Sequence, residues 1–548
     1  MVLSRKDKRR SLEDAVAEHV RPGMTLHLPF GDARPNALLR EVVRQFRGTR
    51  PGFTVISTGL LNSQQALVSS GLVTKLITTF AGENYPTPGP SPVIKRALED
   101  GMEIEDWSIY TMVAALTAGA LGVPFYPVRS FAEGSMSGRA GMAPRATVDN
   151  PFAGGEVTVV PALVPDLTLL HGVAGDAEGN IVMAGPGGER EWGALASRVG
   201  VLATVERIVE RDVIEAHNSQ VRLPAPAVLT ISEVSGGSAP YGTYTAGIGS
   251  IAGYDEDVSA MLAARQSMRT ANEFDSWVDK WLVGNPAGQL DAPSVPQPET
   301  YTDAELMIVA AARRIATRIE AAGFDFVLAG IGQANLAAWL AHATLAPARA
   351  PMLLAEMGMV GYTPQPGDPY LFANRNKPSA AQLTDTTAIL GAYVGHHRMR
   401  TLAAVGAGQL AADGSINSTV GHDGAYLTGS GGVNDIASVA DELVVILRQS
   451  ARRLLDDVEV RTAPGRAVRT VVTDRAIFVR DGDRFRLEAV LVPPARSAAS
   501  TDELLADVRA RTGWSGVEWP ADPIREPLPT ISELETLRAF DPDRHFLR

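Results

Sequence analysis

The chain of 548 residues contains no cysteine. Disulfides, zinc–thiolate sites, iron–sulfur clusters and cysteine nucleophiles are therefore excluded, and a reducing compartment fits this absence. Long apolar runs are also missing, because the most apolar stretch, residues 112–128, is interrupted by Thr117, two glycines and Pro124. A membrane-spanning helix needs about 20 consecutive apolar residues. We therefore expect no transmembrane segment and interpret this stretch as a buried helix followed by a strand.

An excess of basic residues is missing as well. The chain has 50 lysines and arginines against 62 aspartates and glutamates, which gives a formal net charge of -12. A nucleic-acid footprint needs a basic face, and electrostatic attachment to anionic membranes needs basic clusters. We therefore expect neither nucleic acid nor a membrane as a partner. The basic amino terminus is not followed by an apolar signal segment, which predicts a cytoplasmic protein.

The composition that is present, 45% hydrophobic and 20% charged residues, is that of an ordinary soluble globular protein. Short Val/Ile/Leu runs alternate with Ala/Leu/Arg-rich stretches, which is typical of an α/β fold. The runs are nearly continuous, as in parallel strands covered on both faces. We predict strands at residues 53–56, 167–170, 201–205, 326–329 and 402–405, and helices at residues 36–46, 303–322 and 435–448.

Residues 291–302, DAPSVPQPETYT, are rich in proline. Proline favours extended backbone without donors, so this segment is predicted to link two domains, residues 1–290 and 303–548. Both halves repeat the order strand, glycine turn, helix, strand and glycine. This repeat predicts two related open α/β domains with mainly parallel sheets, arranged as a pseudo-dimer. In the register of the repeat Glu356 falls opposite Ser57, so we expect one active site per pair of halves.

Residues 352–361, MLLAEMGMVG, place Glu356 where an apolar strand runs into a glycine turn. Burying an ionised carboxylate is costly unless the group is paired or used, and partial desolvation makes its oxygens more reactive. Glu356 is therefore a candidate nucleophile. A strand-end glutamate that faces solvent is the alternative, because glutamate is rarely buried.

Two glycine-containing turns are candidate ligand loops. In GSGGVND, residues 429–435, glycines allow close backbone approach and the predicted helix that follows attracts anions; a tight loop that caps a core helix is the alternative. In GIGQAN, residues 330–335, Asn335 stands where a dinucleotide fingerprint needs a third glycine. This spacing argues against a nicotinamide enzyme.

Four segments of the second half occur in the order found in one known family: LLAEMGMVG (353–361), GAGQLAADGSINST (406–419), GSGGVNDIAS (429–438) and VVTDRAIF (471–478). In the first half, residues 150–180 and 201–209 match as well. The chain resembles the family I coenzyme A transferases, most closely the glutaconate CoA-transferase branch, with the α-like and β-like subunits fused. One departure is His27-Leu28-Pro29-Phe30, where the family usually has a small glycine-rich turn before the phenylalanine.

The resemblance implies a role for each candidate. Glu356 would attack an acyl-CoA thioester and carry first the acyl group and then CoA, in a ping-pong reaction with anhydride and glutamyl-CoA intermediates. Backbone N–H groups of the loop would stabilise the oxyanions. The oxyanion and CoA-binding loop would comprise Gly431, Gly432, Val433 and Asn434, and a further wall of the site would comprise Gly330, Gly332, Gln333, Asn335 and Phe30.

The resemblance also sets the expected ligands. Acyl-CoA and a small carboxylic acid would be the substrates, and we expect neither a tightly bound cofactor nor a metal. Arg375 and Lys377 are candidates for the CoA phosphates, with solvated loop residues as the alternative. A homodimer or larger homo-oligomer is expected.

Other acyl-CoA reactions occur on the same scaffold, because function resides in the site. The decarboxylating variant uses a cysteine, which this chain lacks. The ring-opening hydrolase has its essential glutamate in the α-like half, where the matching stretch, residues 107–111, contains none, although Glu103 and Glu105 lie just upstream. A CoA-binding protein without turnover is a third alternative.

Overall fold

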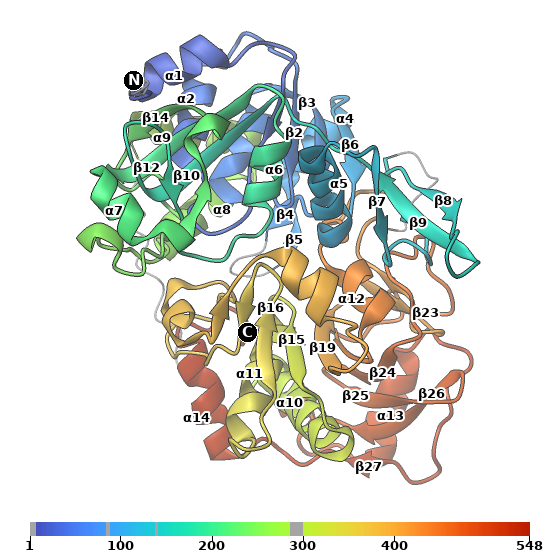
Figure 1. Ribbon diagram of the computed structural model, residues 1–548. Coiled ribbons are helices and arrows are strands. Elements are labelled where there is room, and N and C mark those ends of the chain that lie inside the picture. Colours follow the sequence, from blue (N-terminus) through green and yellow to red (C-terminus); the bar gives the residue numbers. More distant parts are fainter. Residues whose placement is uncertain (1–6, 84–87, 137–140, 285–299, 422–423) are drawn as a thin grey trace.

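Two β-sheets form the centres of two halves of the molecule. The computed structural model describes residues 7–83, 88–136, 141–284, 300–421 and 424–548. The first half is drawn in blue to green and the second in yellow to red, and they meet along one broad interface (Figure 1).

The first sheet is mainly parallel. Its parallel strands follow the order β14–β12–β10–β1–β2–β3–β6, and the short antiparallel strands β11 and β13 continue from β10. The strands are β1 (Thr25–His27), β2 (Phe53–Ser57), β3 (Val73–Thr78), β6 (Glu103–Asp106), β10 (Leu167–Gly175), β11 (Ile181–Val182), β12 (Gly200–Ile208), β13 (Val221–Leu223) and β14 (Val228–Glu233). All nine residues of β10 are buried, as expected for a central parallel strand.

The second sheet has the order β18–β17–β16–β15–β19–β22–β24–β25–β26–β27. Its parallel centre runs from β16 to β24, and antiparallel strands flank it on both sides. The strands are β15 (Phe326–Ala329), β16 (Met352–Ala355), β17 (Met359–Val360), β18 (Gln382–Leu383), β19 (Thr401–Gly406), β22 (Glu442–Ile446), β24 (Val468–Val472), β25 (Ala476–Asp481), β26 (Arg484–Val490) and β27 (Ile524–Arg525).

Smaller sheets lie beside the two large ones: β4 (Gly82–Glu83) with β5 (Gly89–Pro90), β7 (Phe125–Val128) with β9 (Glu156–Pro161) and β8 (Ala146–Asp149), and β21 (Ile416–Asn417) with β20 (Gln409–Ala411) and β23 (Leu454–Leu455). The helices are α1 (Leu12–His19), α2 (Asn36–Phe46), α3 (Ala66–Ser69), α4 (Pro92–Glu99), α5 (Ile109–Leu121), α6 (Arg190–Ala196), α7 (Arg211–Ala216), α8 (Val258–Ser267), α9 (Ala271–Val283), α10 (Asp303–Ala322), α11 (Gln333–Thr344), α12 (Val433–Val439), α13 (Thr501–Ala510) and α14 (Ile531–Phe540).

The predicted repeat is visible in the topology. The unit β1–α2–β2 in the first half has the same order as β15–α11–β16 in the second, and β10 and β19 occupy the same neighbouring positions in their sheets. The prediction of two related α/β domains with mainly parallel sheets is confirmed. The predicted linker 291–302 lies outside the described residues except for its last three.

Among the helix predictions, residues 36–46 and 303–322 are confirmed as α2 and α10. The predicted helix 435–448 is wrong. α12 ends at Val439, and β22 follows at Glu442–Ile446. The sequence ELVVI is a run of mainly β-branched apolar residues, and all five residues are buried between β19 and β24. Burial on both faces of a parallel sheet favours a strand there.

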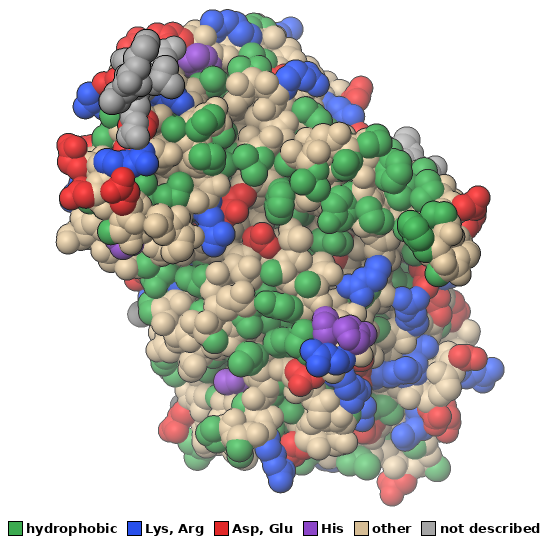
Figure 2. All heavy atoms as spheres, viewed as in Figure 1, with side chains coloured by type: hydrophobic (Ala, Val, Ile, Leu, Met, Phe, Trp, Pro, Cys, Tyr) green, Lys and Arg blue, Asp and Glu red, His purple; other side chains and the backbone are tan. Residues whose placement is uncertain are grey.

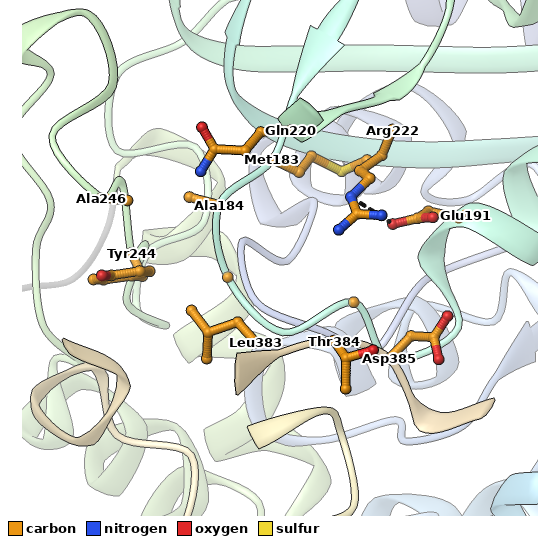
Figure 3. Close-up of a pocket in the computed structure, with 12 residues that line it drawn as sticks. Met183, Ala184, Glu191, Gln220, Arg222, Tyr244, Ala246, Leu383, Thr384 and Asp385 are labelled. Atoms are coloured by element: carbon orange, nitrogen blue, oxygen red, sulfur yellow. Dashed lines mark ion pairs between the residues drawn. The ribbon is translucent and has the colours of Figure 1, made fainter. Parts of the chain in front are cut away.

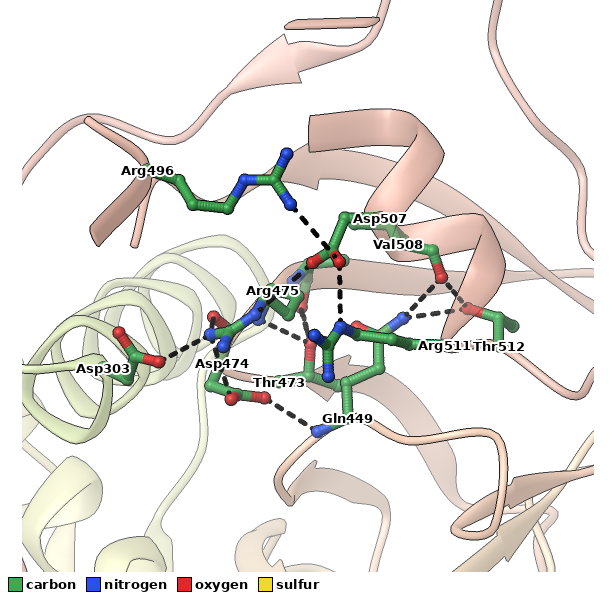
Figure 4. Close-up of polar contacts among 11 residues, drawn as sticks. Asp303, Gln449, Thr473, Asp474, Arg475, Arg496, Asp507, Val508, Arg511 and Thr512 are labelled. Carbon is green, nitrogen blue, oxygen red and sulfur yellow. Dashed lines mark hydrogen bonds and ion pairs between the residues drawn. The ribbon is translucent and has the colours of Figure 1, made fainter. Parts of the chain in front are cut away.

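A polar network ties two helices of the second half to its sheet (Figure 4). Arg475, in the turn between β24 and β25, pairs with Asp303 at the start of α10 (2.8 Å) and with Asp507 of α13 (3.6 Å). The network therefore joins both helices to the sheet.

The surface in view carries acidic and basic side chains interspersed (Figure 2). In the described part of the chain, no helix is both long enough and apolar enough to cross a membrane.

Candidate active site

Glu356 lies in a tight turn between β16 and the antiparallel strand β17. The turn is closed by a hydrogen bond from the Gly358 N–H to the Ala355 carbonyl (3.0 Å). Gly358 has a φ of +122°, and a Cβ there would lie 2.1 Å from the carbonyl oxygen of Thr384. The glycine is therefore required by both conformation and space. The turn holds Glu356 at the carboxyl end of a parallel strand, which is where ligands bind in open α/β sheets.

A cleft of about 1350 Å³ between the halves contains the Glu356 side chain. The side chain is half-buried, with its open side toward the cleft. Eight of the residues predicted from the sequence line this cleft: Phe30, Gly330, Gly332, Gln333, Glu356, Gly431, Gly432 and Val433. The structure thus brings together turns from both halves that are far apart in the chain.

Two predicted site residues do not line the cleft. The amide of Asn335 is buried and donates to the Pro369 carbonyl (3.0 Å). The Asn434 side chain accepts from the Phe131 N–H (3.0 Å) and donates to the Thr462 carbonyl (2.8 Å). Both amides are used to hold the protein together, so their prediction as site residues is corrected.

The glycine loop lies against the Glu356 carboxyl. A Cβ on Gly432 would lie 2.5 Å from Oε2 of Glu356, so this position must lack a side chain for the carboxyl to occupy its place. The Gly431 N–H donates to the Thr79 carbonyl (2.8 Å), and the Gly431 carbonyl accepts from the Ile109 N–H (3.0 Å). Gly431 therefore docks the loop onto the first half, and its N–H is not available to an oxyanion.

Two further carboxyls surround the loop. Asp435 accepts from the Ser108 hydroxyl (2.6 Å) and the Tyr110 N–H (2.9 Å), which ties α12 to the start of α5. Burial raises the pKa of Asp435 to about 6, although these hydrogen bonds act in the opposite direction and lower it. Burial, and then the Asp435 carboxyl, raises the pKa of Glu356 to about 7. Glu356 is thus a weakly stabilised carboxylate.

The wall of the cleft from the first half is largely apolar and includes Phe30, Phe80 and Ile109. Glu189 fixes this wall from behind, because its Oε1 accepts from the Phe30 N–H (2.8 Å) and from the Thr58 hydroxyl (2.7 Å). The Phe30 ring packs tightly against Gly59, where an added Cβ would lie 2.5 Å from the ring carbons.

Arginines line another part of the cleft and were missed in the sequence. They are Arg265, Arg269, Arg448, Arg452, Arg453 and Arg548. Arg448, Arg452, Arg453 and Arg548 are exposed. A usable signal was present, because the basic stretch RQSARR at 448–453 follows β22 directly, at the ligand-binding edge of the sheet. The wrong helix prediction for residues 435–448 hid the strand that places this stretch at that edge.

The two basic residues named from the sequence are placed elsewhere. Lys377 is buried and pairs with Asp32, and an Arg375 guanidinium nitrogen donates to the Pro366 carbonyl (2.7 Å). Neither residue lines the cleft of Glu356. Their proposed contact with phosphates is therefore corrected.

A second cavity of about 340 Å³ lies between the halves (Figure 3). It is lined by Arg222 and Glu191, which pair at 3.5 Å, and by Thr384. The Thr384 N–H donates to the Gly358 carbonyl (2.8 Å), so the cavity borders the back of the Glu356 turn. Glu356 itself belongs to the larger cleft, which is where the chemistry is assigned.

One other carboxyl lines the cleft within the described residues. Glu83 is buried, its Oε1 accepts from the Gln65 amide (2.9 Å), and burial raises its pKa to about 7. Glu105 is instead bound by Lys75 (2.6 Å) and the Trp107 indole (2.8 Å) outside the cleft.

Several known proteins are similar to this chain. The family model described as Coenzyme A transferase matches residues 9–233. The chain is also similar to both subunits of the 3-oxoadipate CoA-transferase of Pseudomonas knackmussii. With one of them the identity is 30% over 280 residues, which cover 50% of this chain and 93% of the relative. With the other the identity is 27% over 260 residues, which cover 44% of this chain and 94% of the relative.

The fold has a solved counterpart in an acyl-CoA transferase (YdiF) apoenzyme from Escherichia coli O157:H7. The TM-score is 0.68 at 15% identity, and the match covers 98% of this chain and 97% of that chain. The likeness at this identity concerns the fold alone. Together with the two relatives from Pseudomonas knackmussii, the family match shows that the chain belongs to the coenzyme A transferase family and is a transferase enzyme.

Proposed function

We propose that this enzyme moves CoA from an acyl-CoA to a carboxylic acid through covalent intermediates on Glu356. The observation that carries the proposal is the contact between Glu356 and Gly432 inside the interface cleft, where a desolvated, poorly stabilised carboxyl meets a backbone without a side chain. Such a carboxylate is a stronger nucleophile than a solvated one.

In the first half-reaction, a Glu356 oxygen attacks the thioester carbonyl, the C–S bond breaks, and an acyl-glutamyl anhydride and CoA thiolate form. The thiolate then attacks the glutamyl carbonyl of the anhydride. The first acid leaves as its carboxylate, and Glu356 holds CoA as a thioester. An incoming carboxylate reverses these steps, so that the new acid leaves as acyl-CoA and Glu356 is regenerated.

Each tetrahedral intermediate carries an oxyanion that needs a donor already in place. The Gly432 N–H is the suitable backbone group, because Gly431 is committed to Thr79. The Gly432 N–H thus takes the place of the pair of glycine N–H groups expected from the sequence.

The exposed arginines of the cleft suit the phosphates of CoA. Arg448, Arg452 and Arg453 form a local positive surface on a chain whose net charge is -12. Binding of the nucleotide there would position the thioester at Glu356 and use remote binding energy for the reaction.

The test is to trap the glutamyl-CoA thioester. After incubation with acyl-CoA without an acceptor acid, peptide mass spectrometry should find CoA on Glu356, and borohydride should convert that side chain to an alcohol. The Glu103→Gln variant is a matched control, because Glu103 is exposed and lies outside the cleft. An adduct on another residue, or turnover by Glu356→Gln, would contradict the proposal.

Thioester hydrolysis is a second candidate, favoured by Glu83 as a further carboxyl of the α-like half in the cleft. A hydrolase needs water alone, whereas a transferase needs an acceptor acid. Product analysis with and without acceptor separates them, because transfer conserves the amount of thioester and hydrolysis lowers it. A thioester loss that is independent of acceptor and is abolished in Glu83→Gln would favour hydrolysis.

A further inference from the structure

Arg34 is a buried cation beside the active site. Arg34 is 3% exposed. The guanidinium lies between the rings of Phe30 and Tyr241, and its central carbon is 3.9 Å from each ring centroid. Stacking on both faces leaves the planar edge, with its N–H donors, as the direction in which the group can bind a partner.

The hydrogen bonds at that edge are long and go to neutral groups. Arg34 donates to Oε1 of Gln64 at 3.4 Å and to the Tyr370 hydroxyl at 3.5 Å. Nε2 of Gln64 is also buried and has no partner among the described residues. No ion pair between Arg34 and a carboxylate is found in the described part of the chain. A buried cation without a paired anion is costly, and unsatisfied buried groups of this kind need an explanation, which a bound anion would supply.

The charged side chains nearby do not supply the anion that Arg34 lacks. A cavity of about 30 Å³ borders Arg34, and Asp32, Lys377 and Glu256 face it. Asp32 is paired with Lys377, and burial raises the pKa of Glu256 to about 7. The space has room for about two waters, so it suits one small polar group and not an entire acid.

The cavity is next to the nucleophile. It is lined by Met357, the residue after Glu356, and by Phe30 and Phe372, which also line the large cleft. The two rings meet edge to face with centroids 6.4 Å apart. An acid that reacts at Glu356 would therefore lay its apolar middle against these rings and direct its far end toward Arg34.

We infer that Arg34 is a specificity-determining residue that binds a second carboxylate, at the end of the acid remote from the carboxylate that exchanges CoA. The inference rests on the proposed function, since it names the class of acid that the same site accepts. A planar guanidinium matches a carboxylate through two parallel hydrogen bonds, and the ligand would supply the anion that the buried cation lacks. A neutral end group would leave the guanidinium unpaired in the complex.

The experiment compares each diacid with its monomethyl ester, which has the same diacid carbon chain. CoA transfer from acetyl-CoA is measured with succinate, glutarate and adipate, and with the monomethyl ester of each, which keeps one carboxylate and removes the far charge. We expect kcat/KM for at least one diacid to exceed that of its ester by about 10²-fold or more, because a buried polar site rejects a ligand that leaves it unpaired. Equal use of each diacid and its ester by the unaltered enzyme would overturn the inference, although CoA transfer itself would remain.

The Arg34→Gln variant should lose the preference, with the diacid rate falling by about 10²-fold and the ester rate changing by a few-fold. Arg34→Lys, which keeps the charge but not the planar fork, should restore part of the preference. A purely structural role would lower both rates equally, and that result would contradict the inference. The CoA adduct on Glu356 formed from acetyl-CoA is measured in parallel, so that failure of the covalent mechanism is seen separately.

Discussion

The two halves share one topology but end their equivalent strands differently. In the first half β2 ends at Ser57, which is fully buried and donates to the Gly59 carbonyl (3.1 Å), and the Thr58 hydroxyl that follows donates to Glu189. In the second half β16 ends before Glu356, whose carboxyl faces the cleft and whose pKa burial raises to about 7. One strand end is neutral and satisfied, whereas the other carries a charge that the protein stabilises poorly.

This difference shows how a duplicated fold can carry a single reaction. The first half supplies the apolar wall and the groups that dock the glycine loop, such as the Thr79 carbonyl. The second half supplies the charge, the loop and the exposed arginines Arg448, Arg452 and Arg453. Since the cleft is closed by both halves, neither contains the site by itself.

Removing the charge makes the two strand ends alike and should have the largest effect. We expect Glu356→Gln to lower CoA transfer by about 10⁴-fold or more, because the covalent route is lost while the fold is kept. The measurement is steady-state transfer together with the mass of the intact protein after acyl-CoA is added. The Glu103→Gln control should stay within about two-fold of the unaltered enzyme. Near-normal transfer by Glu356→Gln would show that the carboxyl that distinguishes the two strand ends is not needed for catalysis.

Moving the charge, without removing it, should have the next largest effect. In Gly432→Ala the added Cβ would lie 2.5 Å from Oε2 of Glu356, so the carboxyl must shift. We expect kcat to fall by about 10²-fold, since small displacements of reacting groups and loss of an oxyanion donor both cost about this much. Gly516→Ala is the matched control, because a Cβ there meets nothing within 4 Å. Equal activity of the two variants would contradict the assigned contact.

The same asymmetry explains what the sequence could and could not predict. The strand before Glu356 and the glycine turn after it are local features, and both were predicted correctly. Asn434 and Asn335 lie in the predicted loops, but their partners Thr462 and Pro369 are distant in the chain. Which polar side chain faces the cleft and which one serves the fold depends on such tertiary contacts, and one sequence does not contain them.

Replacing arginines of the second half should have a smaller effect, on the binding of acyl-CoA. We expect the double variant Arg452→Gln/Arg453→Gln to raise KM for acyl-CoA roughly 3- to 10-fold with little change in kcat, because exposed charge contacts contribute about 0.2–1 kcal/mol each. The increase should shrink at high salt, where such contacts are screened. Arg349→Gln is the control, since Arg349 is 70% exposed and lies outside the cleft. A KM that is unchanged at low salt would remove the arginines from the CoA site.

The smallest effect concerns stability and has a defined pH dependence. The pKa of Glu356 is about 7 in the folded protein against 4.5 for an unperturbed glutamate, so the folded state holds the extra proton between these values. Its contribution to stability is complete below the unfolded pKa and is lost as the pH rises through about 7. Glu356→Gln removes this loss, so the variant should be more stable than the unaltered protein at pH 8 by about 1–2 kcal/mol and nearly equal at pH 5. Thermal unfolding of both proteins at the two pH values measures the difference, with Glu103→Gln as the reference. An increase in stability of the same size at both pH values would instead assign the effect to packing. The ionised Glu356 carboxyl would then not destabilise the folded protein.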